Sequence, residues 1–188
     1  MKTIFLGGIH GVGKSSIIQG VMKGKKHIGH YSFWENVRAI GKNSGKIQDA
    51  KDLSWLSNEV RVSLMKQARE KFTALVASQL YEILLVDSHF SVYENKKIVR
   101  AIDDEELELY DTFILVEVPV DILHTRISQD SKQRTRESCD REKIAQHSIY
   151  ERGIAYDIKQ RCNRELIEVE NIDVEKAIEK VQEGIWSK

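Results

Sequence analysis

Eight residues near the N-terminus, Gly8-Ile9-His10-Gly11-Val12-Gly13-Lys14-Ser15, match the phosphate-binding pattern G-x-x-x-x-G-K-[ST] in full. Glycines let backbone N–H groups converge on phosphate oxygens, and the N-terminus of a following helix adds partial positive charge. The Lys14 ammonium can contact β- and γ-phosphates, and the Ser15 hydroxyl can ligate Mg²⁺. The pattern predicts a nucleoside triphosphate site built from Gly8, Gly11, Val12, Gly13, Lys14, Ser15 and Ser16.

The residues around this loop have the patterns that a working phosphate loop requires. An apolar run, Thr3 to Leu6, precedes it and is typical of a buried strand. An amphipathic stretch from Ser16 to Met22 follows and predicts the first helix. This context argues against the alternative, an accidental glycine-rich turn.

Asp87 is the candidate metal-binding carboxylate. It ends the apolar run Ile83 to Val86, and the carboxyl edge of a parallel sheet is where ligands bind. There it can hold Mg²⁺ together with Ser15, although an aspartate that merely ends a strand is the structural alternative. His89 lies two residues further on and is a weaker candidate for an acceptor contact.

Arginines are concentrated in the C-terminal half, where seven of the eleven lie between positions 126 and 164. Guanidinium groups bind phosphate oxygens bidentately and remain charged. The polar segment near 128–141 resembles a lid over the phosphates, and it carries Arg134 and Arg136. Arg126 and Arg152 are the next candidates for the catalytic set, with Lys14 and Asp87. We expect Arg141, Arg161 and Arg164 to lie on the surface.

Short apolar runs alternate with helical patterns along the chain. Further strands are expected at Thr112–Val116 and Leu166–Val169, with a weaker one near Ile28–Phe33. Helices are expected near Ser54–Gln79, after Pro119, near Arg141–Arg161 and near Val174–Ile185. Gly41–Lys46 reads as a flexible polar loop. The alternation predicts one doubly wound α/β domain spanning residues 1–188.

Composition restricts the function classes. Lys and Arg total 29, as do Asp and Glu, so the net charge is zero and a general nucleic-acid or membrane binder is disfavoured. The two cysteines, Cys139 and Cys162, lack the spacing of a zinc site, and we expect no disulfide framework. Without a long apolar run, the chain is expected to be a cytoplasmic protein of undetermined oligomeric state. The N-K-x-D and D-x-x-G motifs of GTPases are absent from the sequence.

These residues resemble the archaeal-type adenylate kinases, which are compact P-loop nucleoside monophosphate kinases. The resemblance covers Gly8–Ser15, Val86-Asp87-Ser88-His89, the segment from Val116 to Arg126, Arg134-Thr135-Arg136, and a helix carrying His147 and Arg152. It implies a three-layer α/β/α sandwich with a central, mostly parallel five-stranded sheet. It also implies a lid containing Arg134 and Arg136, an Arg152 that reaches the phosphates, and an acceptor-binding insertion near 31–56.

The sequence departs from this family at the acceptor site. Lys51 stands where an arginine is expected to hold the acceptor phosphate, and a lysine cannot bind bidentately. Arg38 or Arg61 could compensate, and the sequence does not choose between them.

Three functions remain open. The first is transfer of the ATP γ-phosphoryl group to a nucleoside monophosphate, with AMP favoured, which needs no general base because the acceptor is already an anion. The second is transfer to a hydroxyl of a small metabolite, with Asp87 as base. The third is a slow regulatory ATPase.

Overall fold

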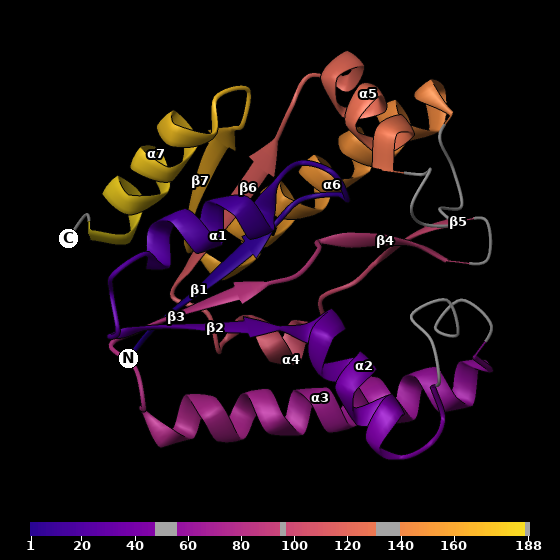
Figure 1. The fold of residues 1–188 in the computed structure, drawn as a ribbon, viewed down its shortest axis with the longest axis vertical. Helices are drawn as coiled ribbons and strands as arrows, with labels where there is room; N and C mark the ends of the chain where they lie inside the picture. Colours follow the sequence, from indigo (N-terminus) through magenta and orange to yellow (C-terminus); the bar gives the residue numbers. More distant parts are fainter. Residues whose placement is uncertain (48–55, 95–96, 131–139, 187–188) are drawn as a thin grey trace.

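The computed structural model describes residues 1–47, 56–94, 97–130 and 140–186. A five-stranded parallel sheet in the order β2-β3-β1-β6-β7 lies between two layers of helices (Figure 1). The strands are β1 (Lys2–Gly7), β2 (Ile28–Ser32), β3 (Ile83–Asp87), β6 (Thr112–Glu117) and β7 (Glu165–Glu170). The three-layer sandwich expected from the sequence is therefore present, and every strand pair in this sheet is parallel.

Alternate residues of each central strand enter two separate cores. In β1, Ile4 and Leu6 face one core and Phe5 faces the other, and all three are at most 1% exposed. Both faces of the sheet are covered, which explains why these strands are almost continuously apolar. Burial of this kind is the main favourable contribution to folding.

Each core is closed by its own helices (Figure 1). The first lies beneath α1 (Lys14–Met22), α5 (Val120–Asp130) and α7 (Val174–Trp186). The second lies beneath α2 (Phe33–Asn43), α3 (Asn58–Ser78), α4 (Asp104–Leu107) and most of the inner face of α6 (Arg141–Cys162). Helix α1 packs beside α7, and α2 beside α3.

The strands expected from the apolar runs are confirmed, including the weaker one, which forms the edge strand β2. The expected loop at Gly41–Lys46 is wrong for its first half, because α2 continues to Asn43. The Ser32 hydroxyl caps this helix by accepting from the Glu35 N–H, and the buried Val37 and Ile40 hold it against the second core. Because the last turn of α2 is polar, the hydrophobic pattern of the sequence does not indicate that this segment belongs to a packed helix.

A hairpin that the sequence analysis missed follows β3. Strands β4 (Ser91–Glu94) and β5 (Lys97–Arg100) pair antiparallel, apart from the central sheet. Each is four residues long and mixes charged with apolar residues, so neither shows a clear period.

Helix α5 shows how Pro119 starts a helix. The Pro119 carbonyl accepts from the Leu123 N–H at 3.0 Å, and the helix begins at Val120. The missing N–H of proline has no cost at such a position. The segment expected as a lid, 128–141, overlaps the end of α5 and the first residue of α6, and residues 131–139 lie outside the described ranges.

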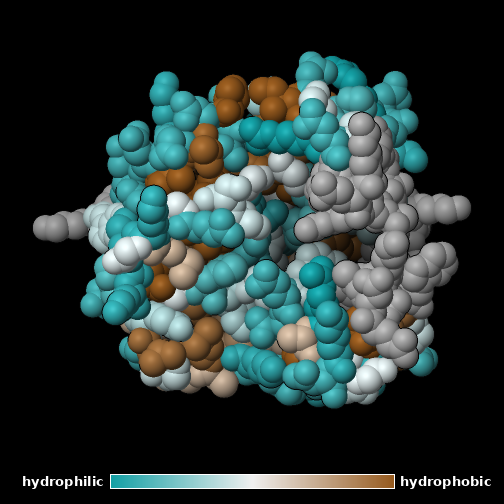
Figure 2. All heavy atoms as spheres, in the orientation of Figure 1, coloured by the Kyte–Doolittle hydropathy of each residue, from teal (hydrophilic) through white to brown (hydrophobic). Residues whose placement is uncertain are grey.

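Hydrophilic side chains cover most of the face shown in Figure 2, with apolar residues in separate patches. Among the described helices, none is long and apolar enough to span a membrane.

Leu84 tests the account of the second core. It is fully buried in β3, so Leu84→Ala should lower the free energy of unfolding by about 2–5 kcal/mol through lost burial and a residual cavity. Leu80 is 67% exposed, and Leu80→Ala should change it by less than about 0.5 kcal/mol. Chemical denaturation measures both, and equal losses would contradict the assigned core.

Candidate active site

The phosphate loop and Asp87 meet at the carboxyl edge of the sheet. β1 ends at Gly7, the loop follows, and α1 begins at Lys14. Leu6 of β1 pairs with Asp87, the last residue of β3. Parallel pairing of two adjacent strands thus places the candidate metal carboxylate beside the loop that precedes α1.

The loop backbone has a conformation that requires glycine. Gly8 and Gly13 have φ angles of 144° and 92°, which side chains with a Cβ rarely adopt. A Cβ on Gly8 would collide with the Val116 carbonyl, and one on Gly13 would collide with the Asn171 amide. The loop therefore lies tightly against β6 and the end of β7. This close backbone packing fits a loop that presents N–H groups to phosphate.

Lys14 is held inside the site. Its side chain is 7% exposed, and Nζ donates to the Gly8 carbonyl at 2.5 Å and to the Ile9 carbonyl at 3.4 Å. Burial raises the pKa of Asp87, while the charges of Lys14 and His30 lower it. Lys14 and Asp87 are thus close enough for their charges to interact, as a phosphate site with a metal carboxylate requires.

The oxygen ligands at this edge fit Mg²⁺ shared with a nucleotide. Ser15 is exposed in the first turn of α1, and Asp87 ends the neighbouring strand. In the described part of the chain, no group of three or more His, Cys, Asp or Glu side chains could hold a metal by itself. Mg²⁺ in such sites is held by one or two protein oxygens, with phosphates and water completing its shell.

Asn171 is a site residue that the sequence analysis missed. It follows β7, is 3% exposed, and donates from Nδ2 to the Val12 carbonyl at 2.7 Å. The main-chain carbonyl oxygen of Asn171 accepts a hydrogen bond from Arg126 Nη2 at 3.0 Å. Arg126 of α5 therefore lies beside the loop, and its contact with a phosphate stays a prediction. The signal for Asn171 was a polar residue directly after a strand, which is too common to single out.

Arg152 lies at the same edge but is paired with a carboxylate. Its guanidinium binds both oxygens of Glu117, the last residue of β6, at 2.7 to 3.1 Å. Glu117 raises the pKa of Arg152, so its cation is retained. A phosphate contact through Nε or Nη2 would require Arg152 to release Glu117, whereas Nη1 takes no part in these hydrogen bonds. Arg134 and Arg136 lie outside the described ranges.

The other arginines of the cluster make surface ion pairs. Arg141 pairs with Asp121, Arg161 with Asp104, and Arg164 with Glu108. Their side chains are 38 to 59% exposed, which agrees with the surface role expected for them.

A second missed residue, Glu151 of α6, fixes the turn that follows Asp87. It is 2% exposed, and its carboxylate accepts from the Phe90 N–H at 2.9 Å, the Ser91 N–H at 2.6 Å and the Ser91 hydroxyl. His89, which precedes Phe90 in this turn, has its Nδ1 atom 2.7 Å from the Gly8 carbonyl oxygen. Sequence spacing could have signalled Glu151, because it shares a helical face with the buried Ile144, Ala155 and Ile158.

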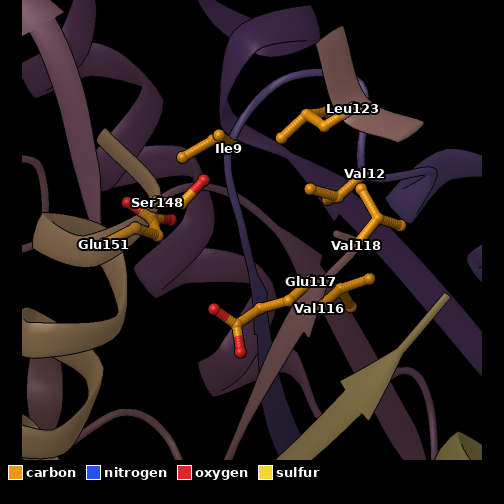
Figure 3. Close-up of a pocket in the computed structure, with 8 residues that line it drawn as sticks. All are labelled: Ile9, Val12, Val116, Glu117, Val118, Leu123, Ser148 and Glu151. Atoms are coloured by element: carbon orange, nitrogen blue, oxygen red, sulfur yellow. The ribbon is translucent and has the colours of Figure 1, made fainter. Parts of the chain in front are cut away.

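A small pocket lies between the loop and α6 (Figure 3). Ile9, Val12 and Leu123 line one side, and Ser148 and Glu151 line the other. Its volume of about 10 Å³ is room for about one water, too little for a substrate.

The two arginines that the sequence left open as acceptor contacts have different surroundings in the structure. Arg38 of α2 is half-buried, and within the described residues its Nε is buried without a hydrogen-bond partner. Arg61 of α3 donates a hydrogen bond from Nη2 to Asn58 Oδ1 at 3.5 Å. Tyr31 and Phe33 are core residues, 5% and 6% exposed. Lys51 falls outside the described ranges.

Comparison with models of known protein families identifies a family for this chain. A family model described as an AAA domain matches residues 7–145, which include the loop, Asp87 and α5. The chain belongs to this family. The match supports the phosphate-loop assignment and does not extend to an adenylate kinase type. A search of curated protein sequences finds no match.

Solved structures of similar shape have low sequence identity. TT1252 from Thermus thermophilus is 12% identical with a TM-score of 0.61, over 98% of this chain and 95% of that one. Shikimate kinase from Acinetobacter baumannii, solved with shikimate, is 12% identical with a TM-score of 0.60, over 98% and 93%. A sugar kinase from a Janibacter species is 13% identical with a TM-score of 0.50, over 96% and 92%. These likenesses confirm the predicted α/β P-loop NTPase fold.

Glu151 provides a pH test of the site's packing. Burial raises its pKa, and the Ser91 hydroxyl, the backbone N–H groups and the Lys14 charge offset only part of that shift. A raised folded-state pKa gives stability that is fully present below the unfolded pKa and lost as pH rises through the folded pKa. The free energy of unfolding of the native protein, relative to Glu151→Gln, should therefore fall as pH rises from about 4.

Chemical denaturation from pH 4 to 8 measures this difference. Glu142→Gln, in the exposed first turn of α6, is the matched control and should give a smaller pH dependence. The prediction is contradicted if the free energy of unfolding of the native protein, relative to Glu151→Gln, rises with pH. That result would mean that the hydrogen bonds to the carboxylate lower its pKa by more than burial raises it.

Proposed function

We propose that this protein is an ATP-dependent kinase that transfers the γ-phosphoryl group to a small-molecule acceptor. The observation that carries the proposal is the convergence of the phosphate loop, the buried Lys14 and Asp87 at one sheet edge. Phosphoryl transfer depends on positioning and on neutralising charge, and these groups supply both. The names of two structural neighbours, shikimate kinase and a sugar kinase, agree with this class.

Each residue has a proposed part. Loop N–H groups and Lys14 bind the phosphates, and Ser15 and Asp87 hold Mg²⁺, which neutralises charge on the β- and γ-oxygens when bound. Arg126 lies beside the nucleotide loop, and Arg152 moves from Glu117 to the transferring group. Arg134 and Arg136 are proposed to close over the phosphates and exclude water.

A nucleoside monophosphate is the proposed acceptor, with AMP favoured. Arg38 supports an anionic acceptor, because its buried Nε has no hydrogen-bond partner among the described residues, and such a nitrogen is costly unless a ligand satisfies it. Helices α2 and α3 pack together, and Glu35 of α2 is close enough to Asp87 for its charge to raise the pKa of that carboxyl. The zero net charge favours a small molecule over a nucleic acid.

A hydroxyl acceptor is the second candidate, and Asp87 favours it. Burial raises the pKa of this carboxyl, which makes it a better proton acceptor from an alcohol. In that case Asp87 would orient the hydroxyl as well as the metal.

An acceptor panel separates these functions. The protein is incubated with Mg·ATP and nucleoside monophosphates, or with hydroxylated acids and sugars, and ADP formation is followed. A sharp rise with a monophosphate supports the first candidate, and a rise with a hydroxyl compound supports the second. ADP formation that no acceptor stimulates would contradict both and favour a regulatory ATPase.

Lys14→Met should lower kcat/KM by roughly 10²- to 10³-fold. The substitution removes the positive charge that stabilises the negative charge developing on the phosphoryl group in the transition state. Lys23→Met, an exposed lysine just after α1, is the matched control and should leave turnover within about twofold. Circular dichroism checks that both variants fold. Near-normal turnover in Lys14→Met would remove the phosphate loop from the mechanism.

A further inference from the structure

Trp34 presents a large aromatic ring at the carboxyl edge of the sheet. It lies in the first turn of α2, which begins directly after Ser32, and Ser32 pairs with Asp87 in the neighbouring strand (Figure 1). Trp34 is 36% exposed. An exposed indole thus stands next to the edge at which the phosphate loop and Asp87 meet.

The environment of Trp34 differs from that of the aromatic residues beside it. Tyr31 and Phe33 are buried, and their rings pack against each other and against Phe72. Within the ranges that the structure describes, the Trp34 side chain makes no ring contact and no hydrogen bond. The face of its indole is therefore not used by the described part of the aromatic core.

Arg38 lies one helical turn after Trp34, on the same side of α2. Residues four apart on a helix have their Cβ atoms about 5–6 Å from each other. Arg38 Nε is buried and lacks a hydrogen-bond partner among the described residues. Glu35 lies within about 100° of both residues around the helix axis, and its charge raises the pKa of Asp87. Trp34 and Arg38 thus belong to the part of α2 that is near Asp87.

An indole and a guanidinium at this spacing fit a ligand that carries a flat ring and an anion a few bonds apart. Indoles stack on planar rings, and guanidinium groups bind phosphate oxygens. A nucleoside monophosphate has both features. A hydroxylated acid or a sugar has no aromatic ring to place on the indole.

We propose that Trp34 is a specificity-determining residue of the acceptor site, and that its indole stacks on the base of a nucleoside monophosphate whose phosphate is bound by Arg38. The inference rests on the proposed function and deepens it, because it names the part of the acceptor that is selected. Every base has a π-face, so Trp34 favours nucleoside monophosphates as a class over sugar phosphates.

AMP and ribose 5-phosphate isolate the contribution of the base, because both carry the phosphate and only AMP carries the ring. Trp34→Leu should raise the Kd of AMP by about tenfold and leave the Kd of ribose 5-phosphate within about twofold. Trp34→Phe keeps a ring and should bind AMP within about threefold of the native protein. Isothermal titration calorimetry measures these constants. Trp186→Leu removes an exposed tryptophan at the end of α7 and is the matched control, with both Kd values unchanged.

Tryptophan fluorescence reports stacking directly, since a base stacked on an indole quenches its emission. AMP should quench the native protein, and ribose 5-phosphate should not. The quench should be lost in Trp34→Phe, although this variant still binds AMP, and should persist in Trp186→Phe. A tryptophan with a purely structural role would not produce this pattern.

The inference and the kinase proposal fail in different ways. The inference is overturned if native protein does not bind AMP, if Trp34→Leu binds AMP like the native protein, or if it weakens ribose 5-phosphate equally. Phosphorylation of an acceptor by such a protein would leave the kinase proposal standing. AMP binding that depends on Trp34, without phosphoryl transfer to any acceptor, supports the inference and contradicts the kinase proposal.

Discussion

The parallel pairing of β1 with β3 and β6 is the constraint on which the rest of the site depends. It places the phosphate loop, Asp87 and Glu117 at one carboxyl edge, each at the end of a strand in which all residues but one are buried. Ligands bind at this edge in open α/β sheets because loops and helix N-termini converge there. A slip of one residue between β1 and β3 would exchange the faces of the sheet and remove Asp87 from the loop.

Polar side chains from distant parts of the chain then fix the loop itself. Asn171, after the last strand, holds the Val12 carbonyl, and His89 holds the Gly8 carbonyl. Glu151 secures the turn that carries His89. Buried polar groups of this kind are costly unless they are hydrogen-bonded, so they also specify one arrangement. The loop is thus organised by its surroundings as well as by its glycines.

Sequence patterns predicted what depends on local residues. The loop, the apolar strands and helix α6 follow from composition and period, and the structure confirms them. Asn171 was missed because a single polar residue after a strand is too common a pattern to indicate a distant partner. The helical spacing of Glu151 could have indicated that it is buried, but not that it binds the Phe90 and Ser91 N–H groups about sixty positions away. The β4–β5 hairpin and the end of α2 were missed because packing outweighs their polar composition. Arg152 is a candidate because of its charge, but its pairing with Glu117 depends on the fold, which brings α6 to the end of β6.

The central claim is direct transfer of the γ-phosphoryl group from ATP at the Gly8–Ser15 loop to an acceptor, and label transfer tests it most directly. ATP radiolabelled in the γ-phosphate is mixed with excess protein, Mg²⁺ and the acceptor that most stimulates ADP formation, and one turnover is followed. The account predicts that the label appears in the phosphorylated acceptor, and that Lys14→Met abolishes this product. Label found solely in inorganic phosphate, or retained in ATP with every acceptor, would contradict it.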